Sequence, residues 1–191
     1  MNTLKYSVFI VLLSALLWTN VSLAADKIVV EQQAATCLNC HESNDHSGHA
    51  DHNLAPNLRA QQPTYLINQP KAYKTGSRSD PIMTALASNL SDEEIKNLAA
   101  YFVNLPSIKT ETNASLAKVG KEKASMCLGC HGSSAEGNGQ YPRLAGQRAD
   151  YLAQQLANFK AGVRKNGQMQ AIANTLSEED MHALAAYFSG L

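Results

Sequence analysis

The pattern Cys-x-x-Cys-His occurs twice in this chain, at residues 37–41 and 127–131, and it uses all four cysteines. This spacing is the attachment signature of a c-type haem, in which two thiols add to the haem vinyl groups and the adjacent histidine binds the iron. The sequence therefore predicts two covalently bound haem c groups as cofactors. The residues that would hold them are Cys37, Cys40, His41, Cys127, Cys130 and His131.

Other uses of paired cysteines explain less of this pattern. A thioredoxin-like redox pair belongs beside a βαβ unit, whereas this chain has no strand-rich, β-branched runs. Four thiolates at this spacing could bind zinc, and the four cysteines could instead form structural disulfides. Both alternatives leave the histidine after each second cysteine unexplained, so haem attachment is the favoured interpretation.

A haem iron with one histidine ligand needs a sixth ligand, or it stays open for chemistry. Met83 and Met169 are separated by 86 residues, and we expect each to lie in a loop and to bind iron through its thioether. Such a ligand stabilises the ferrous state and raises the reduction potential. The alternative is that both are core methionines, the usual place of this residue. Met126 is a poor candidate because it directly precedes the second motif.

Most of the chain repeats itself, which indicates a duplicated domain rather than a solenoid unit. The haem motifs are offset by 90 residues and the rest of the repeat by 86, so the first copy carries four extra residues between His41 and Pro56. A half of this size buries only a small core, so we expect each haem to form the centre of its domain. The matching segments are 65–69 with 151–155, 90–94 with 176–180, and 99–102 with 185–188.

The periodicity of both halves is helical and predicts an all-α fold. We expect helices over 28–36, 65–74, 116–126 and 149–160, followed in each half by a final helix. Ser91 and Ser177 are the expected N-caps of the final helices, because acidic residues follow each of them. Pro70 should kink or end the middle helix of the first half. The expected apolar stripes are Ile95, Leu98, Ala99 and Phe102, and Met181, Leu184, Ala185 and Phe188.

The N-terminus has the features of an export signal. Lys5 precedes an apolar run over residues 8–18, and Ser22-Leu23-Ala24 is a small-x-small cleavage site. The run is shorter than the roughly 20 residues of a spanning helix, although an uncleaved anchor is the alternative. We expect residues 1–24 to be a cleaved signal peptide, which predicts a periplasmic protein without a transmembrane anchor. The domains would then be 25–106 and 107–191.

In its motifs, matched methionines and final helices with an Ala-x-Tyr-Phe segment, the chain resembles the dihaem cytochrome c4 family. The resemblance covers essentially the whole mature chain. It implies two tandem class I cytochrome c domains, each wrapped around one haem, and a non-enzymatic electron carrier. It also implies redox donor and acceptor partners, the acceptor often being a membrane-bound terminal oxidase. By this resemblance, carbonyl groups of Pro56 and Pro142 hold the axial histidines, and Gly120 suits a close crossing of first and last helices.

Two other functions use features of the same sequence. A dihaem peroxidase-like enzyme needs an open or displaceable iron ligand, and the matched methionines argue against one. A haem or metal sensor could use His46, His49 and His52, which are spaced to bind a transition metal or compete for iron. We favour a solvated loop for these histidines.

The charge is unevenly distributed between the halves. The whole chain has a formal net charge of zero, but residues 25–107 carry six basic and nine acidic side chains, and residues 108–191 carry nine and seven. This asymmetry could orient redox partners, while no basic patch suits nucleic acid. The matched Arg78 and Arg164 could pair with haem propionates or remain solvated.

Overall fold

The computed structural model describes residues 28–42, 55–108, 110 and 112–191. The predicted signal peptide and the His46, His49 and His52 loop lie outside the described residues. Within the described part, the chain forms helices and turns, and its only β-type pairing is an isolated bridge between Asn138 and Tyr141. None of the helices described is both long and apolar enough to cross a membrane. The predicted all-α fold is confirmed.

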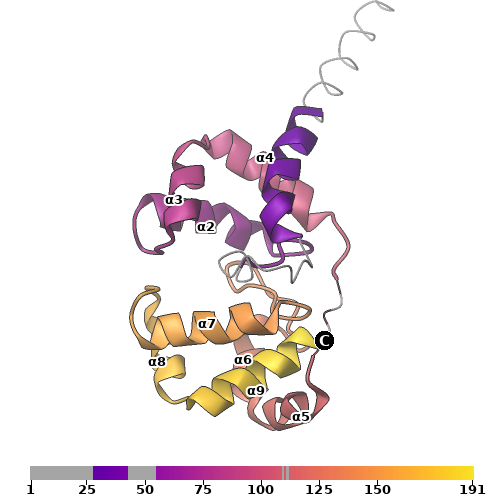
Figure 1. The fold of residues 1–191 in the computed structure, drawn as a ribbon, viewed down its shortest axis with the longest axis vertical. Helices are drawn as coiled ribbons and strands as arrows, with labels where there is room; N and C mark the ends of the chain where they lie inside the picture. The colour runs from indigo at the N-terminus through magenta and orange to yellow at the C-terminus, as the bar shows by residue number, and fades with distance from the viewer. Residues whose placement is uncertain (1–27, 43–54, 109, 111) are drawn as a thin grey trace, which may run out of the picture.

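The helices form two groups that follow each other along the chain and lie one above the other in Figure 1. The corresponding helices have equal lengths of 12, 8 and 12 residues, as the sequence repeat predicts. The first group comprises helical residues 28–41, α2 (Pro63–Lys74), α3 (Pro81–Ser88) and α4 (Asp92–Val103). The second comprises α5 (Ala114–Lys123), α6 (Ser125–His131), α7 (Ala149–Lys160), α8 (Gly167–Asn174) and α9 (Glu178–Ser189).

The final helix of each group begins at a capping box. The Ser91 hydroxyl accepts a hydrogen bond from the Glu94 N–H, and the Glu94 side chain accepts one from the Ser91 backbone. Ser177 and Asp180 form the same reciprocal pair at the start of α9. The predicted N-caps are therefore confirmed, and each satisfies backbone donors that a helix start leaves unpaired.

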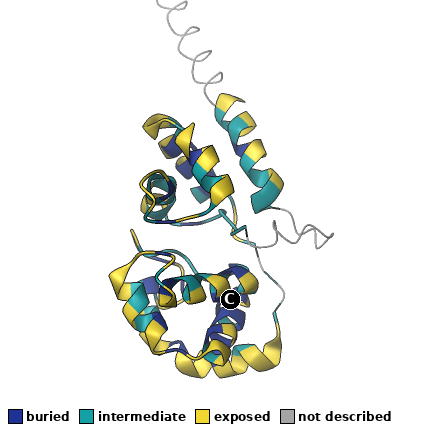
Figure 2. Ribbon diagram, turned by 60° about the vertical axis from the view of Figure 1, so that its left-hand side comes forward, coloured by how far each residue is buried: buried dark blue, intermediate teal, exposed yellow. Residues whose placement is uncertain are grey.

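Buried residues, dark blue on the ribbon of Figure 2, recur along each final helix. All eight residues of the two predicted apolar stripes are buried. In the first group, the fully buried cluster of Leu98, Phe102 and Ala34 is small. In the second, Leu184 and Phe188 of α9 pack in a larger one. Apolar cores of this size are expected of small domains in which a prosthetic group forms the centre of the core.

The first and last helices of the second half cross in close contact at Gly120. A Cβ atom on this residue would lie 2.0 Å from the Ala183 carbonyl oxygen and 2.9 Å from the Tyr187 Cβ. Only the absence of a side chain allows the backbones of α5 and α9 to approach this far. The close crossing expected for Gly120 is therefore present.

Matched polar contacts join the first and last helices of both halves. Gln33 Nε2 donates to Glu94 Oε1 at 2.6 Å in the first half. At the corresponding position of the second half, Lys123 Nζ lies 2.8 Å from Asp180 Oδ1. Each contact ends on the carboxylate of a capping box, so the same residue caps the last helix and binds the first.

Two helix expectations differ from the structure. The helix over 28–41 continues through its haem motif, while the second half divides at Ala124 into α5 and α6. Pro70 does not end α2, which remains helical to Lys74. Proline removes one backbone donor, and the packing of the buried Tyr73 just beyond it holds the last turn in place.

We predict that Gly120→Ala lowers the free energy of unfolding by about 1–3 kcal/mol, the usual effect of inserting atoms into a packed contact. The helices α5 and α9 must move apart to admit the methyl group. Urea unfolding measures the change. Gly167→Ala is the matched control, because a Cβ there meets nothing within 4 Å. Equal stability of both variants would contradict the close crossing.

Candidate functional site

Each Cys-x-x-Cys-His motif lies on a helix. Residues 37–41 form the end of the first described helix, and residues 127–131 end α6. Cysteines three positions apart share one helix face, and all four cysteines are half-buried and lie outside any disulfide. Burial raises the pKa of the Cys37 and Cys127 thiols. The two motifs thus present the same pair of half-buried thiols.

A proline carbonyl holds the histidine of each motif. His41 Nδ1 lies 2.7 Å from the Pro56 oxygen, and His131 Nδ1 lies 2.8 Å from the Pro142 oxygen. A carbonyl only accepts, so Nδ1 carries the proton and donates, and a neutral ring then has its lone pair at Nε2. Burial lowers the pKa of both histidines, which favours this neutral form. The proline contacts expected from the resemblance are present.

The two candidate methionines lie in helices, contrary to the expected loops. Met83 is the third residue of α3, and its N–H donates to the N-cap Asp80. Met169 is the third residue of α8, with Asn166 as its N-cap. Both side chains are half-buried. Each of these helices has only eight residues, too few to show a clear helical period in the sequence. The N-cap residue three positions before each methionine is a signal that could have predicted the helix start.

The structure brings the start of each methionine helix near its haem motif. In the first half, the charges of Arg78 and Asp80, just before α3, are close enough to affect the pKa of His41. In the second half, Gln168 Nε2 lies 3.6 Å from Cys130 Sγ. In each half, the helix that carries the candidate methionine therefore starts near the helix that carries two thiols and a neutral imidazole.

This donor set fits a haem c group in each half. The thiols suit thioether formation, and an imidazole with a thioether is a known axial pair for haem iron. The four cysteines belong to two separate helices, and in the described part of the chain no three His, Cys, Asp or Glu residues are placed to hold a metal ion. The geometry of these residues does not support one four-thiolate zinc site.

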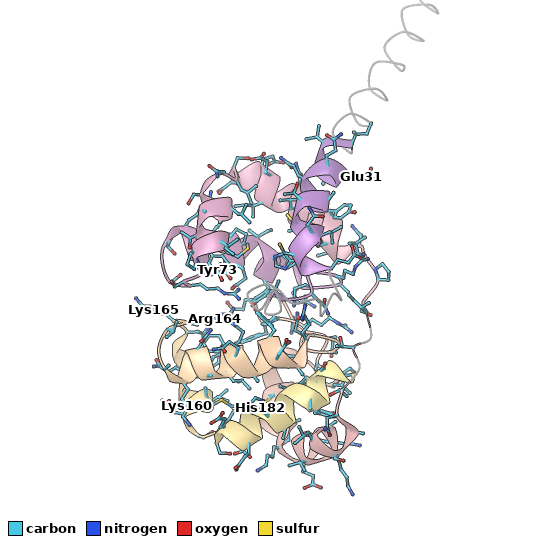
Figure 3. The ribbon with its side chains drawn as sticks, in the orientation of Figure 1. Glu31, Tyr73, Lys160, Arg164, Lys165 and His182 are labelled. Atoms are coloured by element: carbon cyan, nitrogen blue, oxygen red, sulfur yellow. The ribbon has the colours of Figure 1, made fainter. Side chains whose placement is uncertain are left out.

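Arg78 and Arg164 are buried between the two halves, with 8% and 9% of their surfaces exposed. Figure 3 shows Arg164 on the side of α7 that faces the first half. Arg78 Nη2 donates to the Tyr151 hydroxyl at 2.7 Å, and Arg164 Nη2 donates to the Tyr65 hydroxyl at 2.7 Å. Of the two alternatives given for these arginines, solvation does not fit this burial, and pairing with propionates stays a prediction.

Glutamines and aromatic rings complete this arginine network. Gln69 Oε1 accepts from both arginines, at 2.7 and 2.8 Å, and Gln155 Oε1 accepts from both at 3.4 and 2.9 Å. Arg78 lies over the Tyr73 ring and Arg164 over the Phe159 ring, 4.8 and 4.7 Å from the centroids. The sequence analysis missed this network, although its members recur at the 86-residue offset.

Comparisons with known proteins agree with this duplicated architecture. A family model described as "Cytochrome c" matches residues 117–191, and one described as "Cytochrome C oxidase, cbb3-type, subunit III" matches residues 27–102. Cytochrome c4 of Pseudomonas aeruginosa is 35% identical over 184 residues, covering 88% of this chain and 90% of the relative.

A solved structure and a further relative extend the likeness. The Acidithiobacillus ferrooxidans cytochrome c4 structure matches with a TM-score of 0.74 and 34% identity, covering 82% of this chain and 99% of that one. A protein of Stutzerimonas stutzeri named "Thiosulfate dehydrogenase electron acceptor" is 33% identical, covering 83% of this chain and 80% of the relative.

We predict that Arg78→Ala and Arg164→Ala each lower the free energy of unfolding by about 1–3 kcal/mol, because each removes a buried hydrogen bond to a tyrosine hydroxyl of the opposite half. Chemical denaturation of the complete protein measures this loss. Lys165→Ala is the control, since that side chain is exposed beside Arg164. The network would have no role in joining the halves if all three variants were equally stable.

Proposed function

Because the chain belongs to the cytochrome c4 family of dihaem electron-transfer proteins, we propose that each of its two haem c groups is held by the motif and the methionine of one half. Cys37 and Cys40 attach the first haem, with His41 and Met83 as axial ligands. The corresponding residues for the second haem are Cys127, Cys130, His131 and Met169. The domains are residues 25–106 and 107–191.

One observation carries this assignment: the same donor set occurs in both halves, with each imidazole fixed by a proline carbonyl. The chain's own residues then have distinct tasks. The proline holds the ring in the tautomer whose Nε2 can bind iron. The thioether favours the ferrous form. A bound haem supplies a one-electron ferric–ferrous couple, and its potential is tuned by these ligands and by burial.

Matched donor sets favour an electron carrier over an enzyme. A peroxidase-like reaction needs one iron whose sixth position is open or easily vacated, so its two halves should differ in their donors. Here Met83 and Met169 occupy corresponding positions at the third residue of equal helices. Two closed sites would exchange electrons without binding a substrate.

The cellular role proposed is transfer of electrons through the bacterial periplasm to a membrane-bound terminal oxidase. The predicted signal over residues 1–24 supports export, and the match of the first half to a cbb3-type oxidase subunit model fits an oxidase pathway. A relative named as a thiosulfate dehydrogenase electron acceptor makes such a dehydrogenase one candidate donor. The unequal charges of the halves would orient donor and acceptor differently.

We predict that Met83→His and Met169→His each lower the potential of one haem, by on the order of 100 mV, within the range of about 0.8 V that axial ligands span. Imidazole favours the ferric state more than a thioether does. Spectroelectrochemical titration resolves both potentials. Met126→His is the control, because Met126 is exposed beside the second motif. An unchanged potential in either test variant would refute that ligand.

We predict that the reduced protein supports oxygen uptake by periplasm-free membranes that contain the host's terminal oxidases, and that uptake falls as salt screens the encounter. Oxygen-electrode measurements with and without an added donor dehydrogenase check both ends of the pathway. The same membranes without the added protein serve as the control. Reduction by the dehydrogenase with no transfer to membranes would contradict the oxidase assignment alone.

A further inference from the structure

Two matched glutamines, Gln61 and Gln147, each clamp a backbone segment of the opposite half. Both are buried, with 5% of their surfaces exposed. Gln147 Oε1 accepts from the Asn57 N–H at 2.7 Å, and its Nε2 donates to the Asn57 carbonyl at 2.9 Å. Gln61 makes the same pair of bonds to Arg143, at 2.7 and 3.1 Å. The contacts are reciprocal between the halves.

The clamped N–H groups belong to the peptide units that hold the candidate axial histidines. The Asn57 N–H is in the same peptide as the Pro56 carbonyl, which accepts from His41 Nδ1 at 2.7 Å. One continuous chain of hydrogen bonds therefore runs from His41, through this peptide, to Gln147 of the other half.

The second half contains the mirror arrangement. The Arg143 N–H shares its peptide with the Pro142 carbonyl, which accepts from His131 Nδ1 at 2.8 Å. This chain ends at Gln61 of the first half. Each histidine is thus joined to a buried side chain across the boundary by two hydrogen bonds and one peptide.

Hydrogen bonds on the two sides of a peptide strengthen each other. When the N–H donates, the carbonyl oxygen becomes more negative and accepts better, an effect of about 10–30% per bond. A stronger acceptor at Nδ1–H makes the imidazole a better electron donor to a bound metal. That change favours the ferric state and lowers the reduction potential.

The orientation of each glutamine amide is fixed by further contacts. Gln147 Oε1 also accepts from the Arg148 N–H at 3.0 Å, and Gln61 Oε1 accepts from the Gln62 N–H at 2.8 Å. With two donors at the oxygen, the amide cannot rotate without breaking both bonds. The acceptor therefore stays directed at the clamped peptide.

We propose that Gln147 and Gln61 are positioning residues that tune the axial histidine of the opposite half. Each lowers the reduction potential of the haem bound in that opposite half. The proposal rests on the ligand assignment of His41 and His131 under the proposed function. Because this tuning passes across the boundary, the packing of the halves contributes to both reduction potentials.

The test uses the complete dihaem protein with Gln147→Met and Gln61→Met, which keep side-chain length and remove the acceptor. We expect Gln147→Met to raise the potential of the first haem alone, and Gln61→Met to raise that of the second alone. Proton NMR of the reduced, diamagnetic protein gives an independent measurement. The Nδ1–H resonance of the opposite histidine should move upfield as its hydrogen bond weakens.

Gln62→Met is the matched control for losing a bond between the halves. Gln62 Nε2 donates to the Glu136 carbonyl at 3.0 Å across the same boundary, and not to either proline–histidine peptide. Neither potential should change in this variant. Gln147→Glu keeps an acceptor oxygen toward the Asn57 N–H, whether or not the carboxyl group is protonated. The first haem of this variant should therefore have a reduction potential at or below that of the unmodified protein. This variant tests the proposal if Gln147→Met folds poorly.

The proposed tuning is overturned if the reduction potentials and the Nδ1–H chemical shifts stay unchanged in the Gln→Met variants. It is also overturned if each variant affects the haem of its own half, or if Gln62→Met changes the potentials to the same extent. Failure of the ligand assignment has a different signature. Two haem-bound imidazoles have strongly ring-current-shifted signals in the reduced protein. If the unmodified protein lacks these signals, the ligand assignment itself is wrong. If the signals are present but do not change in the Gln→Met variants, only the proposed tuning is refuted.

Discussion

The hydrogen bond from each motif histidine to a proline carbonyl is the contact on which the rest of this structure depends. It fixes the ring, places the proton on Nδ1 and leaves Nε2 as the donor atom. It also joins the helix that carries the motif to the loop that follows it. Because that loop lies at the boundary between the halves, the same peptide unit serves the haem site and the contact between domains.

Duplication gives this boundary its reciprocal chemistry. Two copies of one domain meet through corresponding residues, so a contact can be made twice, as Gln61 and Gln147 show. Arg78 and Arg164 are also buried there and are satisfied largely by tyrosine and glutamine groups of both halves. Burying unsatisfied polar groups is costly, so this polar boundary stabilises one arrangement of the halves. A fixed arrangement is what electron exchange between two haems requires.

Local signals in the sequence were sufficient for much of the fold and the candidate site. The capping boxes at Ser91 and Ser177 depend on residues three positions apart, and the apolar stripes depend on helical spacing. Gly120 and the two prolines followed from the family resemblance. Short helices around Met83 and Met169 were missed because their apolar patterns span only eight residues.

Contacts between the halves could not be derived from the sequence. The repeat identifies matched residues, but it does not say which of them meet across a boundary. Gln61 is 82 positions from its partner Arg143, and no local pattern reports such a distance. At Pro70 the local rule allows the helix to end, but α2 remains helical to Lys74.

The most direct test of two closed His–Met sites is an optical spectrum of the purified protein, oxidised and reduced, with carbon monoxide added to the reduced form. A methionine–iron charge-transfer band in the ferric protein, and no change on adding carbon monoxide, is the predicted result. A carbon monoxide adduct at either haem would contradict it, because an iron that binds a gas has an open or weakly held sixth position.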